Sequence, residues 1–186
     1  MNAYSIALFL HIVGAVGIFV ALGLEWTGLW QIRSATTPQQ VGGWMRILKS
    51  VRKLGFASML TAVITGFYMM VTDWGGEAWI IVTVGALVLM IVLMMALTGP
   101  RMAAMGRALA TEKAPLSQAF YSLANDLLLW ISIQTRIAIV LGIVFLKTAK
   151  PDLGGSLMTI GVAIVLGIAS AFPMPHRERA QEGAAK

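Results

Sequence analysis

The sequence predicts an all-α membrane protein, a polytopic helical bundle of about five transmembrane helices, from its composition and its apolar runs. Hydrophobic residues make up 58% of the 186 residues and charged residues 12%, against roughly 45–50% and ~25% in a soluble domain. Each long apolar run should be a helix, because lipid offers no partner for unpaired backbone groups and the runs lack the alternation of a barrel. Runs near the ~20 residues that cross the hydrocarbon core cover 3–24, 54–72, 78–98, 127–146 and 154–172.

The net charge of +6 is unevenly distributed along the chain. Lysine and arginine concentrate in 31–53, 99–126 and the tail 176–186, which lie on one side if five helices alternate in direction. The positive-inside rule then places the N-terminus outside and the C-terminus in the cytoplasm. The basicity therefore indicates membrane topology, assisted by anionic lipid, and not a nucleic-acid partner.

We expect a single bundle over 1–175 followed by a mobile polar tail over 176–186. Between the first two spans, residues 38–53 repeat apolar side chains every three to four positions against basic ones, which predicts an amphipathic helix. That helix could lie on the cytoplasmic face or extend the second span. The pair Gly99-Pro100 is expected to close the third span, because proline lacks the N–H donor and clashes with the preceding turn.

Polar residues form a stripe on three of the five runs. Arg136 lies about nine residues into the fourth run, near the bilayer midplane, on one face with Ser132. A charge at the midplane costs roughly 2.5–3.5 kcal/mol unless it faces protein or water. In the first run, His11 and Glu25 fall on one face, with Glu25 near the cytoplasmic boundary. In the second run, hydroxyl groups recur at helical spacing at Thr61, Thr65 and Tyr68.

These stripes predict a shared polar interior, and antiparallel packing of the first and fourth runs would set His11 and Arg136 within a turn or two in depth. Two structural interpretations stay open beside it. Arg136 could form a salt bridge, with Glu25 or Asp126 as the carboxylate, and His11 could make a helix–helix hydrogen bond instead of binding a ligand. Small residues in the fifth run, including Gly167, predict close packing within the chain or between subunits. The interior would be lined by His11, Thr61, Thr65, Tyr68, Ser132 and Arg136, with Glu25 at its cytoplasmic boundary.

Several chemistries are excluded by residue content. The chain has no cysteine, no glycine-rich phosphate cradle and no HExxH zinc motif. Haem between two intramembrane histidines is excluded within one chain, since His11 is the only histidine in an apolar run. Haem with one histidine ligand, or with histidine and methionine, stays open, with His11 as the axial ligand.

Two stretches carry a resemblance to a known family. They are 8-LFLHIVGAVGIFVALGLEW-26, a first span with a histidine followed by small residues, and 97-LTGPRMAAMGRAL-109, a span ending in Pro-Arg before a basic helix. The chain resembles a family of small bacterial integral membrane proteins of unknown function, distantly similar to the copper-resistance D domain. The resemblance implies a helical bundle in the bacterial cytoplasmic membrane, a link to copper or haem, and His11 as a candidate ligand position.

Three classes of function follow from these patterns, and no reaction class is predicted. The first is a binding or transport protein for a small anionic ligand, with Arg136 as its charge partner and His11 as a pH-sensitive hydrogen-bonding group. The second is a haem-binding redox protein. The third is a non-catalytic assembly subunit of a membrane complex, in which Arg136 and Gln134 face an acidic helix of another subunit. As partners we expect the lipid bilayer and either further copies of this chain or other subunits of a membrane complex.

Overall fold

The computed structural model describes residues 2–172, and this part of the chain is helical with no strand. Four of its helical segments are long and apolar enough to cross a membrane, namely Ala3–Ser34, Pro38–Trp74, Ala78–Leu109 and Gln118–Ala149. The all-α membrane fold is thereby confirmed, whereas the fifth span and the orientation stay predictions. The elements are α1 (Ala3–Ser34), α2 (Pro38–Met69), η1 (Met70–Trp74), α3 (Ala78–Leu93), η2 (Met94–Thr98), α4 (Gly99–Leu109), α5 (Gln118–Ala124), α6 (Leu127–Ala149) and α7 (Leu153–Ala169).

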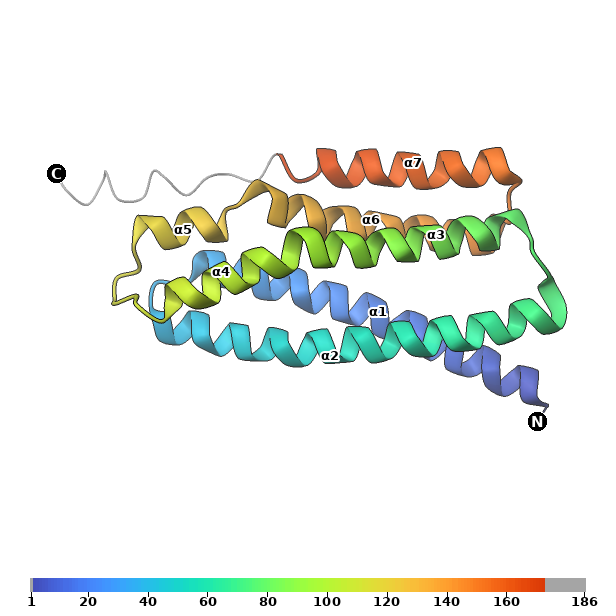
Figure 1. The fold of residues 1–186 in the computed structure, drawn as a ribbon, viewed down its shortest axis with the longest axis horizontal. Helices are drawn as coiled ribbons and strands as arrows, with labels where there is room; N and C mark the ends of the chain where they lie inside the picture. Colours follow the sequence, from blue (N-terminus) through green and yellow to red (C-terminus); the bar gives the residue numbers. More distant parts are fainter. Residues whose placement is uncertain (1, 173–186) are drawn as a thin grey trace.

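Successive long helices run in opposite directions (Figure 1). One end of the bundle holds the α1–α2 turn, α4 and α5, and the other end holds the start of α1 and the turns that lead into α3 and α7. The tail 176–186 lies outside the described residues. The alternation expected from the sequence is therefore present, and α7 lies parallel to the other rods although it has only 17 residues.

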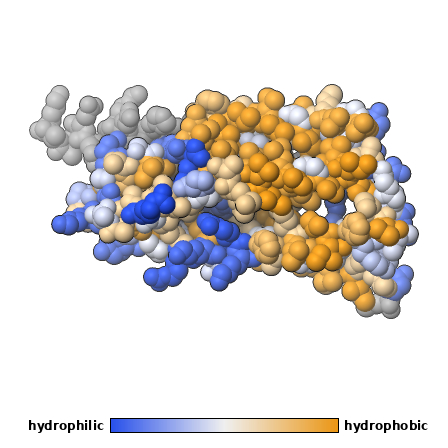
Figure 2. Space-filling view, viewed as in Figure 1, coloured by the Kyte–Doolittle hydropathy of each residue, from blue (hydrophilic) through white to orange (hydrophobic). Residues whose placement is uncertain are grey.

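The surface has an apolar zone bounded by aromatic residues. Figure 2 shows hydrophobic residues covering the half of the molecule that contains α7, with hydrophilic residues gathered at the end that carries α4. Tyr4 accepts a hydrogen bond from Trp74 at one boundary, and Trp26 stacks on Trp30 at the other. Tyr4 and Trp26 lie about 33 Å apart along α1 at 1.5 Å per residue. This spacing matches the ~30 Å hydrocarbon core, with aromatic belts at its two interfaces.

The second long helix begins well before the apolar run 54–72. The Thr37 hydroxyl caps it by accepting from Gln40 N, and Pro38 stands in its first turn, where a missing N–H costs nothing. From there α2 continues without a break to Met69. Residues 38–53 are thus an extension of the second span, one of the two arrangements that the sequence left open.

Pro100 does not end the third long helix, contrary to the prediction from Gly99-Pro100. The chain passes through the π-helical turn η2 and continues as α4 to Leu109. In this wider turn Gly99 N–H donates to Met94 O, five residues back. The wider turn accommodates the proline, whose missing donor and bulky ring would otherwise break the α-helical ladder.

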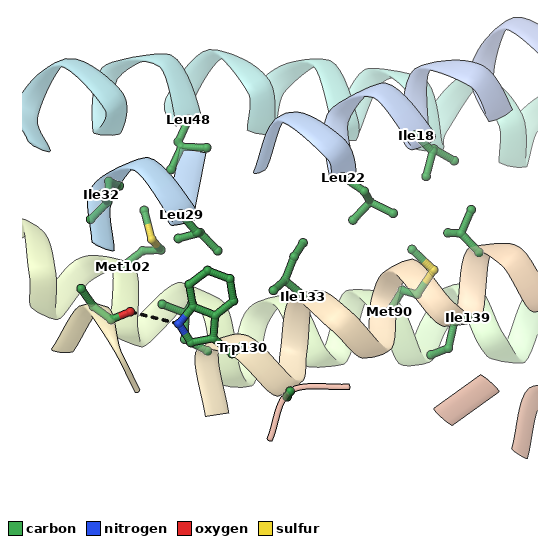
Figure 3. Packing of buried hydrophobic residues seen from close by; sticks show 14 of the residues in the cluster. Ile18, Leu22, Leu29, Ile32, Leu48, Met90, Met102, Trp130, Ile133 and Ile139 are labelled. Carbon is green, nitrogen blue, oxygen red and sulfur yellow. Dashed lines mark hydrogen bonds between the residues drawn. The ribbon is translucent and has the colours of Figure 1, made fainter. Parts of the chain in front are cut away.

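The core lies where the α1–α2 hairpin meets α3, α4 and α6. Figure 3 shows Leu22 and Leu29 of α1 pointing toward Trp130 and Ile133 of α6. The indole of Trp130 donates from Nε1 to Ala124 O at 3.1 Å, so this buried polar atom is satisfied. This hydrophobic contact thus joins the α1–α2 hairpin to α6 near the end of the bundle that holds α4 and α5.

Glycines let two helix pairs approach closely. A Cβ at Gly14 would lie 2.8 Å from Ala62 N and Ser58 O on α2. A Cβ at Gly167 would lie 2.5 Å from Thr135 Cα on α6. The small residue Gly167 of the last apolar run therefore packs within the chain, against α6.

Outside the helices, the loop after α4 contains a carboxylate whose titration should affect stability. The Ser117 hydroxyl and backbone N–H donate to Glu112 and hold the pKa of its carboxyl below the usual 4.5. Because the folded-state pKa is lowered, the stabilisation is present above pH 4.5 and is lost as the pH falls through the folded value. We expect wild-type protein to lose more melting temperature than Glu112→Gln between pH 5 and pH 3; equal losses would contradict this.

Candidate functional site

The buried arginine of α6 forms an ion pair with the glutamate of α1. Arg136 Nη1 and Nη2 donate to the two carboxylate oxygens of Glu25 at 3.0 and 2.9 Å. The Arg136 side chain is 4% exposed and that of Glu25 is 21% exposed. This two-pronged geometry is the strongest form of arginine–carboxylate contact, and it neutralises the arginine within the chain.

A hydrogen-bond chain orients the guanidinium from the opposite side. Arg136 Nη2 donates to Thr98 Oγ1 at 3.2 Å, and Thr98 Oγ1 lies 2.9 Å from Ser132 Oγ. Ser132 Oγ donates to Leu93 O at 3.1 Å, so its single hydrogen is used there and Thr98 must donate to Ser132. The order of donation is therefore Arg136 to Thr98 to Ser132 to the Leu93 carbonyl.

The segment α3–η2 supplies two members of this chain, since Leu93 is the last residue of α3 and Thr98 closes the π-helical turn η2. Thr98 is 3% exposed and was missed from the sequence, where only its position directly before Gly99-Pro100 could have indicated it. The other candidate carboxylate, Asp126, pairs instead with Arg101 Nε at 2.6 Å and caps α6. Glu25 is thus the partner of Arg136, one of the two carboxylates that the sequence offered.

A cavity of about 380 Å³ opens beside the ion pair, between α1, α2 and the α3–η2–α4 rod. Its walls are apolar and rich in methionine, including Met59, Met90 and Met94. Its charged lining residues are Glu25, Arg136 and Arg52. The size falls within the ~300–1,000 Å³ typical of small-molecule sites, which also combine apolar walls with a few polar groups.

Arg52 lies at about the same depth as Glu25. In the antiparallel α1–α2 pair, a Cβ at Gly55 would meet Ala21 and a Cβ at Gly28 would meet Leu48, which puts position 52 opposite position 24. The cavity therefore has three charged side chains, Glu25, Arg52 and Arg136, at the end nearer α4; we call this group the charged ring. From there an apolar extension runs toward the middle of the bundle.

His11 lies in a second polar cluster, apart from Arg136. Its Nδ1 lies 2.8 Å from Ala62 O and 3.3 Å from Thr65 Oγ1, and its Nε2 contacts Lys147 Nζ. Lys147 and Arg136 are separated by about 16 Å along α6. The expectation that His11 and Arg136 lie within a turn or two in depth is therefore wrong, because about three turns of α6 separate their contacts and Glu25, not His11, lies opposite Arg136.

Two other predicted lining residues are in neither cluster. The Thr61 hydroxyl donates to Ala57 O at 2.9 Å within its own helix, which satisfies it locally. Tyr68 is 39% exposed, and neither residue lines the cavity. The hydroxyl stripe of α2 thus contributes only Thr65, which joins the His11 cluster.

Comparisons with protein-family models, with curated proteins and with solved structures found no match to this chain. The resemblance to the copper-resistance D domain consequently stays a prediction. Function has to be inferred from the two clusters and the cavity.

The haem interpretation does not fit the geometry around His11. Both ring nitrogens already have partners, and His11 does not line the 380 Å³ cavity. Within residues 2–172, no group of three or more His, Cys, Asp or Glu side chains could hold a metal ion. Arg136 is paired with Glu25 and is therefore already occupied within the chain, whereas the expectation of a partner subunit stays a prediction.

Proposed function

We propose that this protein binds an anionic amphiphile, a molecule with a carboxylate or phosphate head and an apolar chain, in the cavity between α1, α2 and α3. The observation that carries this proposal is the lining: apolar walls with Glu25, Arg136 and Arg52 gathered at one level. The two arginines and one glutamate leave one uncompensated positive charge. An anionic head at that level would neutralise it.

Arg52 is the residue that would bind the head group. Both carboxylate-facing nitrogens of Arg136 are occupied by Glu25, so Arg136 acts through the ion pair and not as a free cation. Arg52 is exposed at the cavity and forms no ion pair within residues 2–172. A guanidinium suits carboxylates and phosphates, because its planar donors match their oxygens.

The apolar extension suits a flexible chain. Methionine side chains are unbranched and polarisable, and they adapt to ligands of variable shape. Leu60 and Val63 continue the wall along α2 beyond Arg52 and are exposed on the same side. The chain of an amphiphile would therefore run from the charged ring toward the middle of the membrane.

We further propose that the end carrying Arg46, Lys49 and Lys53 is cytoplasmic, with five spans and the N-terminus outside. These exposed side chains lie on one face of α2 and would meet the anionic inner surface of a membrane. The head group of the ligand would then lie near the cytoplasmic leaflet.

The test compares palmitate with hexadecanol, which has the same chain without the charge, by thermal shift of the full chain in a zwitterionic detergent. We expect palmitate to stabilise the wild-type protein and hexadecanol to do so weakly. Arg52→Gln should weaken palmitate binding roughly tenfold, the equivalent of ~1.4 kcal/mol. Lys53→Gln is the matched control, because Lys53 is the next basic residue and does not line the cavity.

Equal responses of Arg52→Gln and Lys53→Gln to palmitate would contradict a head-group role for Arg52. Equal stabilisation by palmitate and hexadecanol would contradict anion recognition altogether.

A further inference from the structure

Two polar contacts join α1 to α6, one at each end of their shared length. The inner contact is the Glu25–Arg136 ion pair, and the outer contact is between His11 Nε2 and Lys147 Nζ. The outer contact has no part in the cavity. Its chemistry differs from that of the inner contact, because it brings together two basic groups.

The position of the imidazole hydrogen follows from the partners of His11. Ala62 O can only accept, so the neighbouring Nδ1 must donate. The Thr65 hydroxyl already donates to Thr61 O at 2.6 Å and is therefore also an acceptor toward Nδ1. A neutral His11 consequently carries its hydrogen on Nδ1 and presents the lone pair of Nε2 to the ammonium of Lys147.

Gly66 fixes the ring in this place. A Cβ at that position would lie 3.0 Å from His11 Cε1 and 3.2 Å from Nδ1. The ring thus lies against the backbone of α2, with Lys147 on its other side. It has little room to turn Nε2 away from the lysine.

Within the described part of the chain, no carboxylate forms an ion pair with His11 or Lys147. Within residues 2–172 the side-chain ion pairs are Arg101–Asp126 and Arg136–Glu25, so none reaches Lys147 or His11. The remaining ionisable groups at this end have other contacts. Lys150 lies 3.9 Å from the Trp74 ring centre, and Tyr4 accepts a hydrogen bond from Trp74. Asp73 accepts a hydrogen bond from Thr72, and Asp152 caps α7. Tyr68 on α2 and Glu77 before α3 are exposed.

We propose that His11 and Lys147 form a proton-binding site that holds the α1–α2 hairpin to α6 in its singly charged state and releases it when a second proton binds. In the singly charged state one proton of the Lys147 ammonium is shared with Nε2. A proton taken from solvent by Nε2 makes His11 an imidazolium, which then has a cation opposite it and no acceptor for the new N–H. Like charges at this distance in a poorly solvated place repel strongly, so the contact opens.

This proposal is independent of what the cavity binds. Opening the His11–Lys147 contact would leave the Glu25–Arg136 ion pair in place. The α1–α2 hairpin would then move away from α6 at the His11 end while staying attached to α6 at Glu25. The expected consequence is a loss of stability as the pH falls, with its origin at one histidine.

The experiment measures the melting temperature of the full chain in nanodiscs between pH 8 and pH 4.5. We expect wild type to lose roughly 5 °C more than His11→Gln over this range, the scale of a ~1–2 kcal/mol change in a chain of this size. His176→Gln is the matched control, since it removes the only other histidine of the chain, and it should behave as wild type. Lys147→Gln should also lose less than wild type, because a protonated His11 then faces no cation.

A second measurement serves if His11→Gln fails to fold. Nitrogen NMR of labelled histidine in His176→Gln reports His11 alone, and it should show hydrogen on Nδ1 at pH 8 and on both nitrogens in acid. The proposal is overturned if His11→Gln keeps the full pH dependence of wild type, or if the neutral ring carries its hydrogen on Nε2.

Discussion

Glu25→Gln is expected to destabilise the protein by about 3–5 kcal/mol, because it leaves the guanidinium of Arg136 buried without its counter-charge. Arg136 is 3% exposed and its other bonds go to neutral oxygens, so no remaining group can replace the carboxylate. At roughly 2–4 °C per kcal/mol, the melting temperature should fall by about 10 °C. Thermal unfolding followed by circular dichroism in detergent measures this directly.

Two comparisons isolate the cause. Glu77→Gln removes an exposed carboxylate that makes no capping bond at the start of α3, and it should change the melting temperature by less than 1–2 °C. The double variant Glu25→Met with Arg136→Met should recover most of the loss, since replacing a whole buried pair with apolar residues is often neutral. A melting temperature of Glu25→Gln equal to that of wild type would show that the pair does not form.

Gly167→Ala is expected to separate α7 from α6 at their closest approach. The added methyl carbon would lie 2.5 Å from Thr135 Cα, 3.0 Å from Thr135 N and 3.1 Å from Gln134 O. All three are backbone atoms, so no side chain can rotate away and the helices themselves must move. We expect a loss of about 2–3 kcal/mol, at the upper part of the range for overpacked cores.

The matched control for this packing is Gly161→Ala, the same substitution on the same helix. No described atom lies within 4 Å of a Cβ at position 161. Alanine should there raise helix stability by up to ~1 kcal/mol, because glycine is the poorer helix former. Similar effects of the two substitutions in an unfolding titration would refute close α6–α7 contact at Gly167.

The sequence predicted the long apolar helices, because apolar runs of transmembrane length are local properties, but it ended the third of them too early at Gly99-Pro100. It placed Ser132 and Arg136 on one face of α6 and offered Glu25 as a partner, and the structure joins these three. It could not supply the depth at which α1 meets α6. In the structure His11 contacts Lys147, and Glu25 contacts Arg136.

The cavity was also beyond reach from the sequence. Its wall comes from α1, α2, the α3–η2–α4 rod and Arg136 of α6, whose lateral order no periodicity encodes. Methionines such as Met90 and Met94 have the same sequence pattern whether they fill a core or line a site. Thr98 was missed for a related reason. Proline usually ends a helix, so the residues around it were expected to leave the span instead of turning into it.

The wide turn η2 fixes the rotational phase between the two halves of the third rod. If the same residues Met94–Thr98 were wound as a regular α-helix, everything beyond them would rotate by about 100° relative to α3, because the wide turn takes up one extra residue. Arg101 would then face away from Asp126, and Thr98 would no longer lie between Arg136 and Ser132. The extra residue that η2 takes up thus keeps the buried hydrogen-bond chain aligned with the Arg101–Asp126 ion pair at the start of α6.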